Sequence, residues 1–315
     1  MAGSLLSKVA VELMFSPQRT LRRTVNCAGI GVHSGRKVKI SLVPAPADSG
    51  IRFRRMDLGG VEIPAVVSEL GNRQQLQTGL GSGEATVETV EHLLAALRAM
   101  GVDNACVELN HREVPIMDGS SAPWVYLIQD AGVKTLSATR KAIRVDRPMQ
   151  LAHGDKRIAL YPYQGFKVSY TISFDHPLLR HQHKSMDLDE QVFIDEIAPA
   201  RTFGFLKEVE FLRQRGQAMG GSFDNSIVLG ETGVLNPLRF EDEFVRHKIL
   251  DAIGDMALLG HPIQGHLVVH RGGHALHTAF AREVLAQRDA WQFVDASTPE
   301  FVGVDAAAVA VRHAS

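Results

Sequence analysis

Histidine and carboxylate side chains recur in this sequence at spacings that suit metal-assisted hydrolysis. In the segment 244–255, FVRHKILDAIGD, His247 and Asp251 are four residues apart. On a helix both would lie on one face, and Asp255 would continue that face one turn later. An imidazole and a carboxylate at this spacing can bind one divalent metal ion. A His–Asp surface pair has the same spacing and is common, so the pattern by itself favours the surface pair.

Two further segments add the remaining groups. Glu91 and His92 stand where TVETV meets the helical segment 92–100 (HLLAALRAM), and a helix N-terminus favours a carboxylate. His274 follows two glycines, which permit close approach of the backbone. Taken singly, these residues are more simply a helix cap with an incidental histidine and a structural histidine. Together the three segments supply metal ligands, a base and an acid, as metal-assisted amide hydrolysis requires.

Composition and charge narrow the class of protein. The chain has 315 residues, 45% of them hydrophobic, and a formal net charge of −1, which predicts one large or two moderate domains and no nucleic-acid partner. Its two cysteines, Cys27 and Cys106, form no disulfide framework. The first 15 residues do not resemble a signal peptide, and no apolar run reaches the roughly 20 residues that span a bilayer. We therefore expect a cytoplasmic protein without stable membrane insertion.

The elements that must position these residues fall into two similar halves. Strand-like segments alternate with turns over 18–65, notably at 38–43 and 51–55, followed by the helix 92–100, a strand at 105–109 and a helix near 122–131. The polar segment 133–140 is a candidate interdomain linker. Strands are then expected at 143–145, 157–160, 167–174 and 267–270, and helices around 205–215 and 241–259. Strands followed by helices, twice over, predict two α+β layers rather than a parallel βαβ sheet.

Longer blocks of sequence resemble one enzyme family. The blocks GIGVHSGRKV, APADSGIRFRR, VEHLLAAL, EVPIMDGSSAPWVYLI, ARTFGF, GGSFDNSIVL, LRFEDEFVRHKILDAIGDMALLGHPIQG and RGGHALH are similar, in order, to those of the UDP-3-O-acyl-N-acetylglucosamine deacetylases. They extend from about residue 18 to 280. The stretch 72–88 departs from the family pattern, since it lacks cysteine.

The resemblance implies a role for each candidate catalytic residue. One catalytic Zn²⁺ ion would be bound by His92, His247 and Asp251, with Glu91 as the general base. His274 would be the general acid, held cationic and oriented by Asp255. Thr202 would donate a hydrogen bond to the oxyanion, and Lys248 would contact the substrate. The reaction would remove acetate from UDP-3-O-acyl-N-acetylglucosamine, the committed step of lipid A biosynthesis.

The resemblance also implies a fold and the contacts with the substrate. The family fold is α+β, a two-domain sandwich in which helices of both domains pack between two sheets. We place the domains at 16–135 and 140–290, with terminal extensions at 1–15 and 291–315. An insert at 203–228 would form an apolar passage for the acyl chain. The expected substrate contacts are Phe203, Phe205, Val209 and Gly221 in the insert, Phe174 against uracil, Lys156 at the diphosphate and His33 near the sugar.

Two other functions compete with this one. A zinc amidohydrolase acting on another N-acetylated substrate would use the same metal chemistry, although the chain has no HExxH motif. A catalytically silent UDP-sugar-binding relative would be expected to have lost Glu91 or His274, and both are present. The expected partner is the acylated UDP-sugar alone, and a monomer is the default oligomeric state.

Overall fold

The first half of the chain is organised around a five-stranded sheet. The computed structural model describes residues 16–71, 74 and 76–296. The strands lie in the order β2-β3-β8-β4-β5, and their bounds are Val25–Ile30, Lys37–Pro44, Ala105–Leu109, Ile51–Arg55 and Val61–Pro64. In β3 buried and exposed residues alternate, with Val38 and Ile40 inside and Lys37 and Lys39 outside. One face of the sheet is therefore apolar and must be covered.

The second half is organised around a seven-stranded mixed sheet. The order β11-β12-β17-β10-β18 forms its main path, and β13 connects β14 to β17. The bounds are Lys141–Val145 (β10), Met149–His153 (β11), Lys156–Tyr161 (β12), Phe166–Ile172 (β13), Gln182–Asp187 (β14), Ile263–His270 (β17) and Trp291–Asp295 (β18). Strand β17 is central, since it pairs antiparallel with β12 and parallel with β13 and β10. The chain that follows β17 and leads into the next element, beginning at His274, therefore starts from the middle of the sheet.

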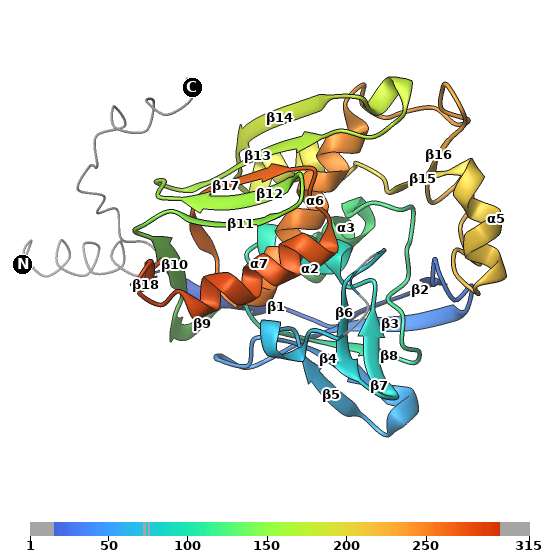
Figure 1. Ribbon diagram of the computed structural model, residues 1–315. Coiled ribbons are helices and arrows are strands. Elements are labelled where there is room, and N and C mark those ends of the chain that lie inside the picture. The colour runs from blue at the N-terminus through green and yellow to red at the C-terminus, as the bar shows by residue number, and fades with distance from the viewer. Residues whose placement is uncertain (1–15, 72–73, 75, 297–315) are drawn as a thin grey trace, which may run out of the picture.

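Four helices fill the space between the two sheets, as Figure 1 shows. They are α2 (Glu91–Ala99), α3 (Ala122–Ala131), α6 (Glu243–Met256) and α7 (His274–Ala286). Helix α6 packs against α2, α7 and strands β13 and β14, while α7 covers β11 and β12. Nearly all of α6 is buried, because it is covered from both sides. The residues that it carries are thus held in the centre of the molecule.

Close contact between α2 and α6 depends on one glycine. A Cβ atom at Gly254 would lie 2.0 Å from the carbonyl oxygen of Glu91 and 2.9 Å from its Cα atom. Only a residue without a side chain allows the backbones to approach this closely. Gly254 thereby sets the distance between the first turn of α2 and the middle of α6.

Smaller elements complete the chain. Three two-stranded ladders pair β1 (Pro17–Leu21) with β9 (Val133–Thr139), β6 (Gly79–Ser82) with β7 (Ala85–Glu88), and β15 (Phe203–Phe205) with β16 (Ile227–Leu229). Two more α-helices are α4 (Glu190–Val192) and α5 (Leu206–Gln214). Short 3-10 turns occur at Met56–Leu58, Val67–Glu69, Pro177–Leu179 and Ala257–Leu259, and a π turn at Phe193–Ile197.

The expected α+β class is confirmed, while several elements differ from those expected. Most of the segment 133–140, the candidate interdomain linker, forms strand β9, which pairs antiparallel with β1. Backbone pairing with β1 orders this polar segment despite its lack of an apolar face. Helix α7 was not expected from the sequence, and β17 begins four residues before the expected strand. In the described part of the chain, no helix is long and apolar enough to cross a bilayer.

We propose that the two halves are domains at 16–135 and 140–290. In support of this division, the five-stranded sheet takes its strands from 25–109 and the seven-stranded sheet from 141–295. Strand β18 lies just beyond the expected second boundary. The extension 1–15 and residues 297–315 of the C-terminal extension lie outside the described residues.

Candidate active site

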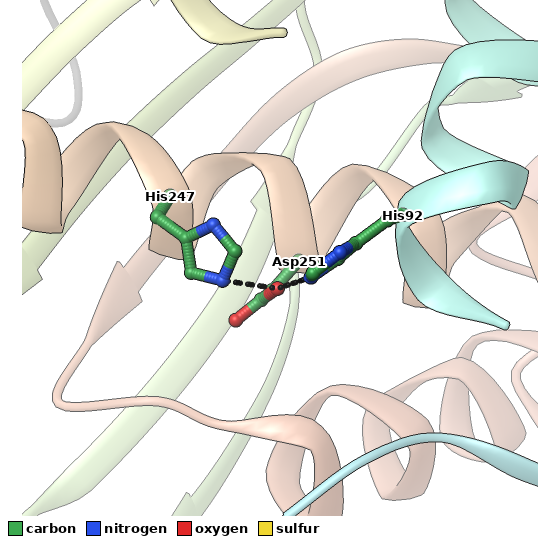
Figure 2. A group of neighbouring side chains, drawn as sticks. All are labelled: His92, His247 and Asp251. Atoms are coloured by element: carbon green, nitrogen blue, oxygen red, sulfur yellow. Dashed lines mark ion pairs between the residues drawn. The ribbon is translucent and has the colours of Figure 1, made fainter. Parts of the chain in front are cut away.

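The three predicted metal ligands meet where α2 faces α6. Figure 2 shows Asp251 between the imidazoles of His92 and His247. Asp251 Oδ1 lies 3.5 Å from His92 Nε2 and 3.3 Å from His247 Nε2. All three side chains are buried, with at most 5% of their surface exposed. The helical spacing of His247 and Asp251 thus brings both onto one face, and α2 supplies the third group.

These three groups fit a tetrahedral metal ion. Ligand atoms about 2.0–2.1 Å from a tetrahedral zinc lie about 3.3 Å from one another, close to the separations seen here. Asp251 Oδ1 is buried and has no hydrogen-bond partner, although it faces two ring nitrogens. His247 Nδ1 lies 3.1 Å from the Ala200 carbonyl oxygen. Donation there would leave the Nε2 lone pair of His247 facing Asp251, the arrangement that a metal-binding histidine needs.

Burial and charge set the protonation of these ligands. Burial lowers the pKa of His247 to about 3, so its imidazole is neutral at physiological pH. Burial alone would raise the pKa of Asp251, but the neighbouring cations Lys248 and His274 hold that pKa well below the usual range. A neutral imidazole and an ionised carboxylate are the forms that bind a metal ion.

Glu91 lies beside this group at the first turn of α2. Its Oε2 atom accepts a hydrogen bond from the backbone N–H of Thr78 at 3.0 Å. Its Oε1 atom is 4.0 Å from His274 Nε2. Burial raises the pKa of Glu91 above its ordinary value. A carboxylate with a raised pKa is better suited to accept a proton near neutral pH.

His274, the first residue of α7, lies beside both Glu91 and Asp251. Its Nδ1 atom is 2.9 Å from Asp255 Oδ2, and its Nε2 atom is 3.7 Å from Asp251 Oδ2. Burial alone would lower the pKa of His274, but the carboxylates of Asp255 and Asp251 raise it to about 9. His274 is therefore protonated at neutral pH, with its Nε2–H facing the metal group.

Asp255 is held by two other groups that the sequence did not point to, His277 and Thr78. His277 Nδ1 lies 2.9 Å from the same Oδ2 atom that His274 contacts, and the Thr78 hydroxyl donates to the other oxygen, Oδ1. The far nitrogen of His277, Nε2, is 3.0 Å from the Tyr170 hydroxyl. Asp255, His274 and His277 also form a second set of close ligand atoms. Because the two Nδ1 atoms stand at hydrogen-bond distance from Asp255, we interpret this set as a hydrogen-bonded network.

Lys248 and Thr202 border the same site. The Nζ atom of Lys248, an expected substrate contact, lies 2.5 Å from Asp251 Oδ2. The long side chain reaches the carboxylate three residues further along the helix. Thr202 follows Ala200, the partner of His247, by two residues. Its backbone N–H donates to Gly119 and its carbonyl accepts from Ile227, so its position is fixed from two sides.

The insert 203–228 lies against the loop that contains His33. The N–H of Met219 donates to the His33 carbonyl at 3.1 Å, and the N–H of Gly220 donates to the Val32 carbonyl at 3.0 Å. The backbones of the two segments approach most closely at Gly220, where a Cβ atom would lie 2.4 Å from the Gly31 carbonyl oxygen. At Gly221 the nearest atom would be 3.4 Å away, so Gly221 is not required for this approach.

The insert also carries exposed apolar side chains. Leu206, Phe211, Met219 and Phe223 each have more than half of their surface exposed, whereas Val209 on α5 is partly buried. Exposed apolar side chains in one segment of a monomer often mark a binding surface. This composition is consistent with the expected contact with an acyl chain.

An aromatic group connects the insert to the metal ligands. The Phe203 ring centroid lies 6.2 Å from that of His247 and 5.9 Å from that of Phe174. The Phe205 ring centroid lies 6.0 Å from that of Phe174. The structure therefore brings three predicted substrate contacts, Phe174, Phe203 and Phe205, together, and it places Phe203 next to the metal ligand candidate His247.

The remaining predicted contacts, His33 and Lys156, are separate from this group. The His33 side chain has a buried Nδ1 atom without a hydrogen-bond partner, and burial lowers its pKa. Lys156 is exposed at the start of β12. The adjacent Asp155 forms an ion pair with Arg271 at 3.0 Å. Because Arg271 precedes His274 by only three residues, this pair connects the hairpin of Lys156 to the loop that enters α7.

Comparison with known proteins agrees with this geometry. The family model described as UDP-3-O-acyl N-acetylglycosamine deacetylase matches residues 18–286. The UDP-3-O-acyl-N-acetylglucosamine deacetylase of Pseudomonas entomophila is 50% identical over 289 residues, which are 89% of this chain and 95% of that protein. The enzymes of the same name from Acidithiobacillus ferrooxidans and Idiomarina loihiensis are 48% and 47% identical, over 88% of this chain and 93% and 92% of theirs. The resemblance seen in the sequence is thus confirmed, and the chain belongs to the UDP-3-O-acyl N-acetylglycosamine deacetylase family.

Proposed function

We propose that His92, His247 and Asp251 bind one catalytic zinc ion, with which this deacetylase hydrolyses the N-acetyl group of UDP-3-O-acyl-N-acetylglucosamine. The reaction and the substrate follow from the family to which the chain belongs, and they place it in lipid A biosynthesis. The observation that supports the residue roles best is the position of Glu91 and His274. One is a carboxylate with a raised pKa and the other a protonated imidazole, and they lie 4.0 Å apart beside the metal group.

The proposed metal site contributes an electrophile. A zinc ion in such a site lowers the pKa of a water molecule and polarises a carbonyl group. Glu91 is placed to accept the proton of the attacking water, because its Oε2 is held by Thr78 while Oε1 faces the site. Lys248 donates a hydrogen bond to Asp251 at 2.5 Å, which keeps this proposed ligand ionised and holds its carboxylate in position.

His274 is placed to complete the reaction. When the C–N bond of the acetamide breaks, the departing glucosamine nitrogen must receive a proton. The protonated Nε2 of His274 can supply it, while Nδ1 remains bonded to Asp255 at 2.9 Å. His277 and Thr78 fix Asp255 from the other side, so the imidazole keeps its orientation as its charge changes. Thr202, fixed by Gly119 and Ile227, would supply a hydrogen bond to the oxyanion.

The substrate would extend from this centre in two directions. The exposed apolar side chains of the insert 203–228 are available for the methylene groups of the acyl chain. Phe174 lies beside Phe203 and Phe205 at the edge of the site and would stack on the uracil ring. Lys156 would meet the diphosphate, and His33 would lie near the sugar.

The test is mass-spectrometric detection of acetate release from the acylated UDP-sugar. Glu91→Gln preserves the size of the side chain but removes the base, so kcat is expected to fall about 10²–10⁴-fold, with the zinc content unchanged. The matched control is Glu84→Gln, at an exposed position in the β6–β7 turn. Activity of Glu91→Gln within threefold of the wild type would contradict the assignment of the base. Full activity of protein shown to be metal-free would contradict the metal site.

A further inference from the structure

A cavity separate from the active site lies at the C-terminal ends of α2 and α6. It has a volume of about 280 Å³ and lies between the last turns of α2 and α6, β13 and the segment 188–193. Its lining contains none of the metal ligands and none of the residues of the insert. This volume is just below the lower end of the range of small-molecule sites, about 300 Å³, so the cavity has room only for a small ligand.

An incompletely paired arginine faces this cavity. The Nε and Nη1 atoms of Arg98 are buried without a hydrogen-bond partner, and its Nη2 atom donates to the Ala257 carbonyl at 3.4 Å. The nearest carboxylate, Asp103, is 4.0 Å from Nη1. Burial lowers the pKa of Arg98 to about 10, and the guanidinium is still charged at neutral pH. A buried charge without close partners is costly, and an anion in the cavity would reduce that cost.

Two more arginines, Arg19 and Arg140, line the same cavity. Arg140 Nε donates to Asp103 Oδ1 at 2.8 Å, so Arg98 and Arg140 share one carboxylate. Arg19 Nη1 and Arg140 Nη2 converge on Gly101, at 2.5 and 3.7 Å from the position of a Cβ atom there.

The other acidic residues at the cavity are already engaged. Asp189 caps α4 through the N–H of Val192 at 2.8 Å. Glu190 lies 3.8 Å from Arg19, and half of its side chain is exposed. The positive charge of Arg98 and Arg140 is therefore compensated only by Asp103.

Apart from His261, the rest of the lining is largely apolar. It consists of side chains from α2, β13, the segment 188–193, α6 and β17, among them Ala99, Phe166, Leu188, Phe193, Ile253 and Ile263. A simple inorganic anion would leave this wall without a partner, whereas an uncharged apolar molecule would leave Arg98 unpaired. A ligand that satisfies both has a charged end and an apolar body.

We propose that this cavity binds a small carboxylate with a short apolar chain. The carboxylate faces Arg98 and Arg140, and the chain lies along the apolar wall toward Phe166. Because Arg98 belongs to α2 and Ile253 to α6, the ligand contacts both helices that carry the active site. This site is independent of the proposed catalytic function.

Octanoate is a suitable probe for calorimetric titration of the zinc-loaded full-length enzyme. Arg140→Gln removes one of the two guanidinium groups proposed to face the carboxylate of octanoate, and it should weaken octanoate binding at least tenfold. The matched control Arg147→Gln, whose side chain pairs with Asp289 at the surface, should leave binding unchanged. Octanol should bind at least tenfold more weakly than octanoate, because it lacks the charge. Ala99→Leu keeps all the charges but fills the cavity, so it should also weaken octanoate binding. This variant tests the cavity if Arg140→Gln does not fold.

Photolabelling identifies where the probe binds. A diazirine-bearing octanoate should label peptides of 253–263, and Arg140→Gln or Ala99→Leu should abolish that labelling. Labelling confined to the insert 203–228 would overturn the proposal, since the probe would then occupy the proposed acyl-chain surface. Equal competition by inorganic phosphate would also overturn it, because the apolar wall would then contribute nothing. Unchanged octanoate binding in both variants would exclude the cavity.

Discussion

Substitution of Gly254 by alanine should separate the two halves of the active site. Gly254 lies on α6 between Asp251 and Asp255, and it faces the first residue of α2, Glu91. A Cβ atom there would be 2.0 Å from the Glu91 carbonyl oxygen and 2.9 Å from its Cα atom. Ordinary van der Waals contact begins near 3.4 Å. The atoms that must yield belong to the backbone, so the helices would have to move apart by more than 1 Å.

The expected magnitude combines two opposing effects. Alanine is favoured over glycine within a helix by about 0.8–1.0 kcal/mol, whereas overpacking a rigid interior costs about 1–3 kcal/mol. We therefore expect a net loss of stability of up to about 2 kcal/mol. The effect on catalysis should be larger, because Glu91 and His92 move relative to Asp251. A displacement of about 1 Å can cost about 10²-fold in rate, and we expect kcat/KM to fall by that factor together with the affinity for zinc.

The measurements are urea unfolding, zinc content and kcat/KM of the purified variant. Gly233→Ala is the matched control, since a Cβ atom at Gly233 meets nothing within 4 Å. Its stability and activity should stay close to those of the wild type. If Gly254→Ala is as stable as the wild type and keeps kcat/KM within threefold, the close approach of α2 and α6 does not position the site as we argue.

Four further predictions follow from the contacts of the site. His92→Ala should lose zinc, as measured by elemental analysis, and activity with it; retention of one zinc per chain would exclude His92 as a ligand. The pKa of Glu91 is raised and that of His274 is about 9, so kcat should rise with pH through the former and fall through the latter. His274→Gln should remove the alkaline fall in the pH profile and lower kcat about 10²–10⁴-fold, whereas an intact fall would indicate another acid. His277→Phe should lower kcat about tenfold at unchanged KM. His277→Asn should retain more of the wild-type kcat, because its amide N–H can donate to Asp255. Equal losses of kcat in both variants would argue against the hydrogen bond between His277 and Asp255. Each buried CH₂ contributes about 0.8 kcal/mol, so kcat/KM should fall steeply as the acyl chain is shortened. The fall should be less steep in Val209→Ala. If the wild type hydrolyses the unacylated UDP-sugar as fast as the acylated one, the insert does not bind the acyl chain.

One substitution that the sequence alone would suggest for the acyl-binding insert is excluded by the backbone. Ala218 appears in the sequence as a small residue of the apolar wall, and a bulkier residue there would be expected to block long chains. In the structure Ala218 has a φ of 53°, in the left-handed region that side chains rarely adopt. A larger residue at 218 would add backbone strain, and its effect could not be assigned to the acyl chain.

Local sequence patterns determined much of the fold and part of the site. The apolar residues of 244–255 repeat with a helical period, so the helix and the shared face of His247 and Asp251 could be predicted without tertiary information. The same holds for the strands at 51–55 and 105–109 and the helix at 122–131, which the structure reproduces at the same residues. In these segments local propensity and burial favour the same conformation. The assignment of Glu91 and His274, in contrast, relied on resemblance to the family, because neither residue has a distinctive local pattern.

Only the tertiary structure decided which distant residues complete the site. Thr78 contacts Asp255 across 177 residues of sequence, and His277 reaches the same carboxylate through α7, a helix that the sequence analysis missed. The segment 133–140 has no apolar face, and its strand forms because β1 provides a backbone partner. Arg98 lies in the last turn of α2, and only the packing of the chain around it leaves its Nε and Nη1 atoms buried without a hydrogen-bond partner. Periodicity reports which face of an element is buried, whereas hydrogen bonds and charges between distant segments depend on how those faces are packed together.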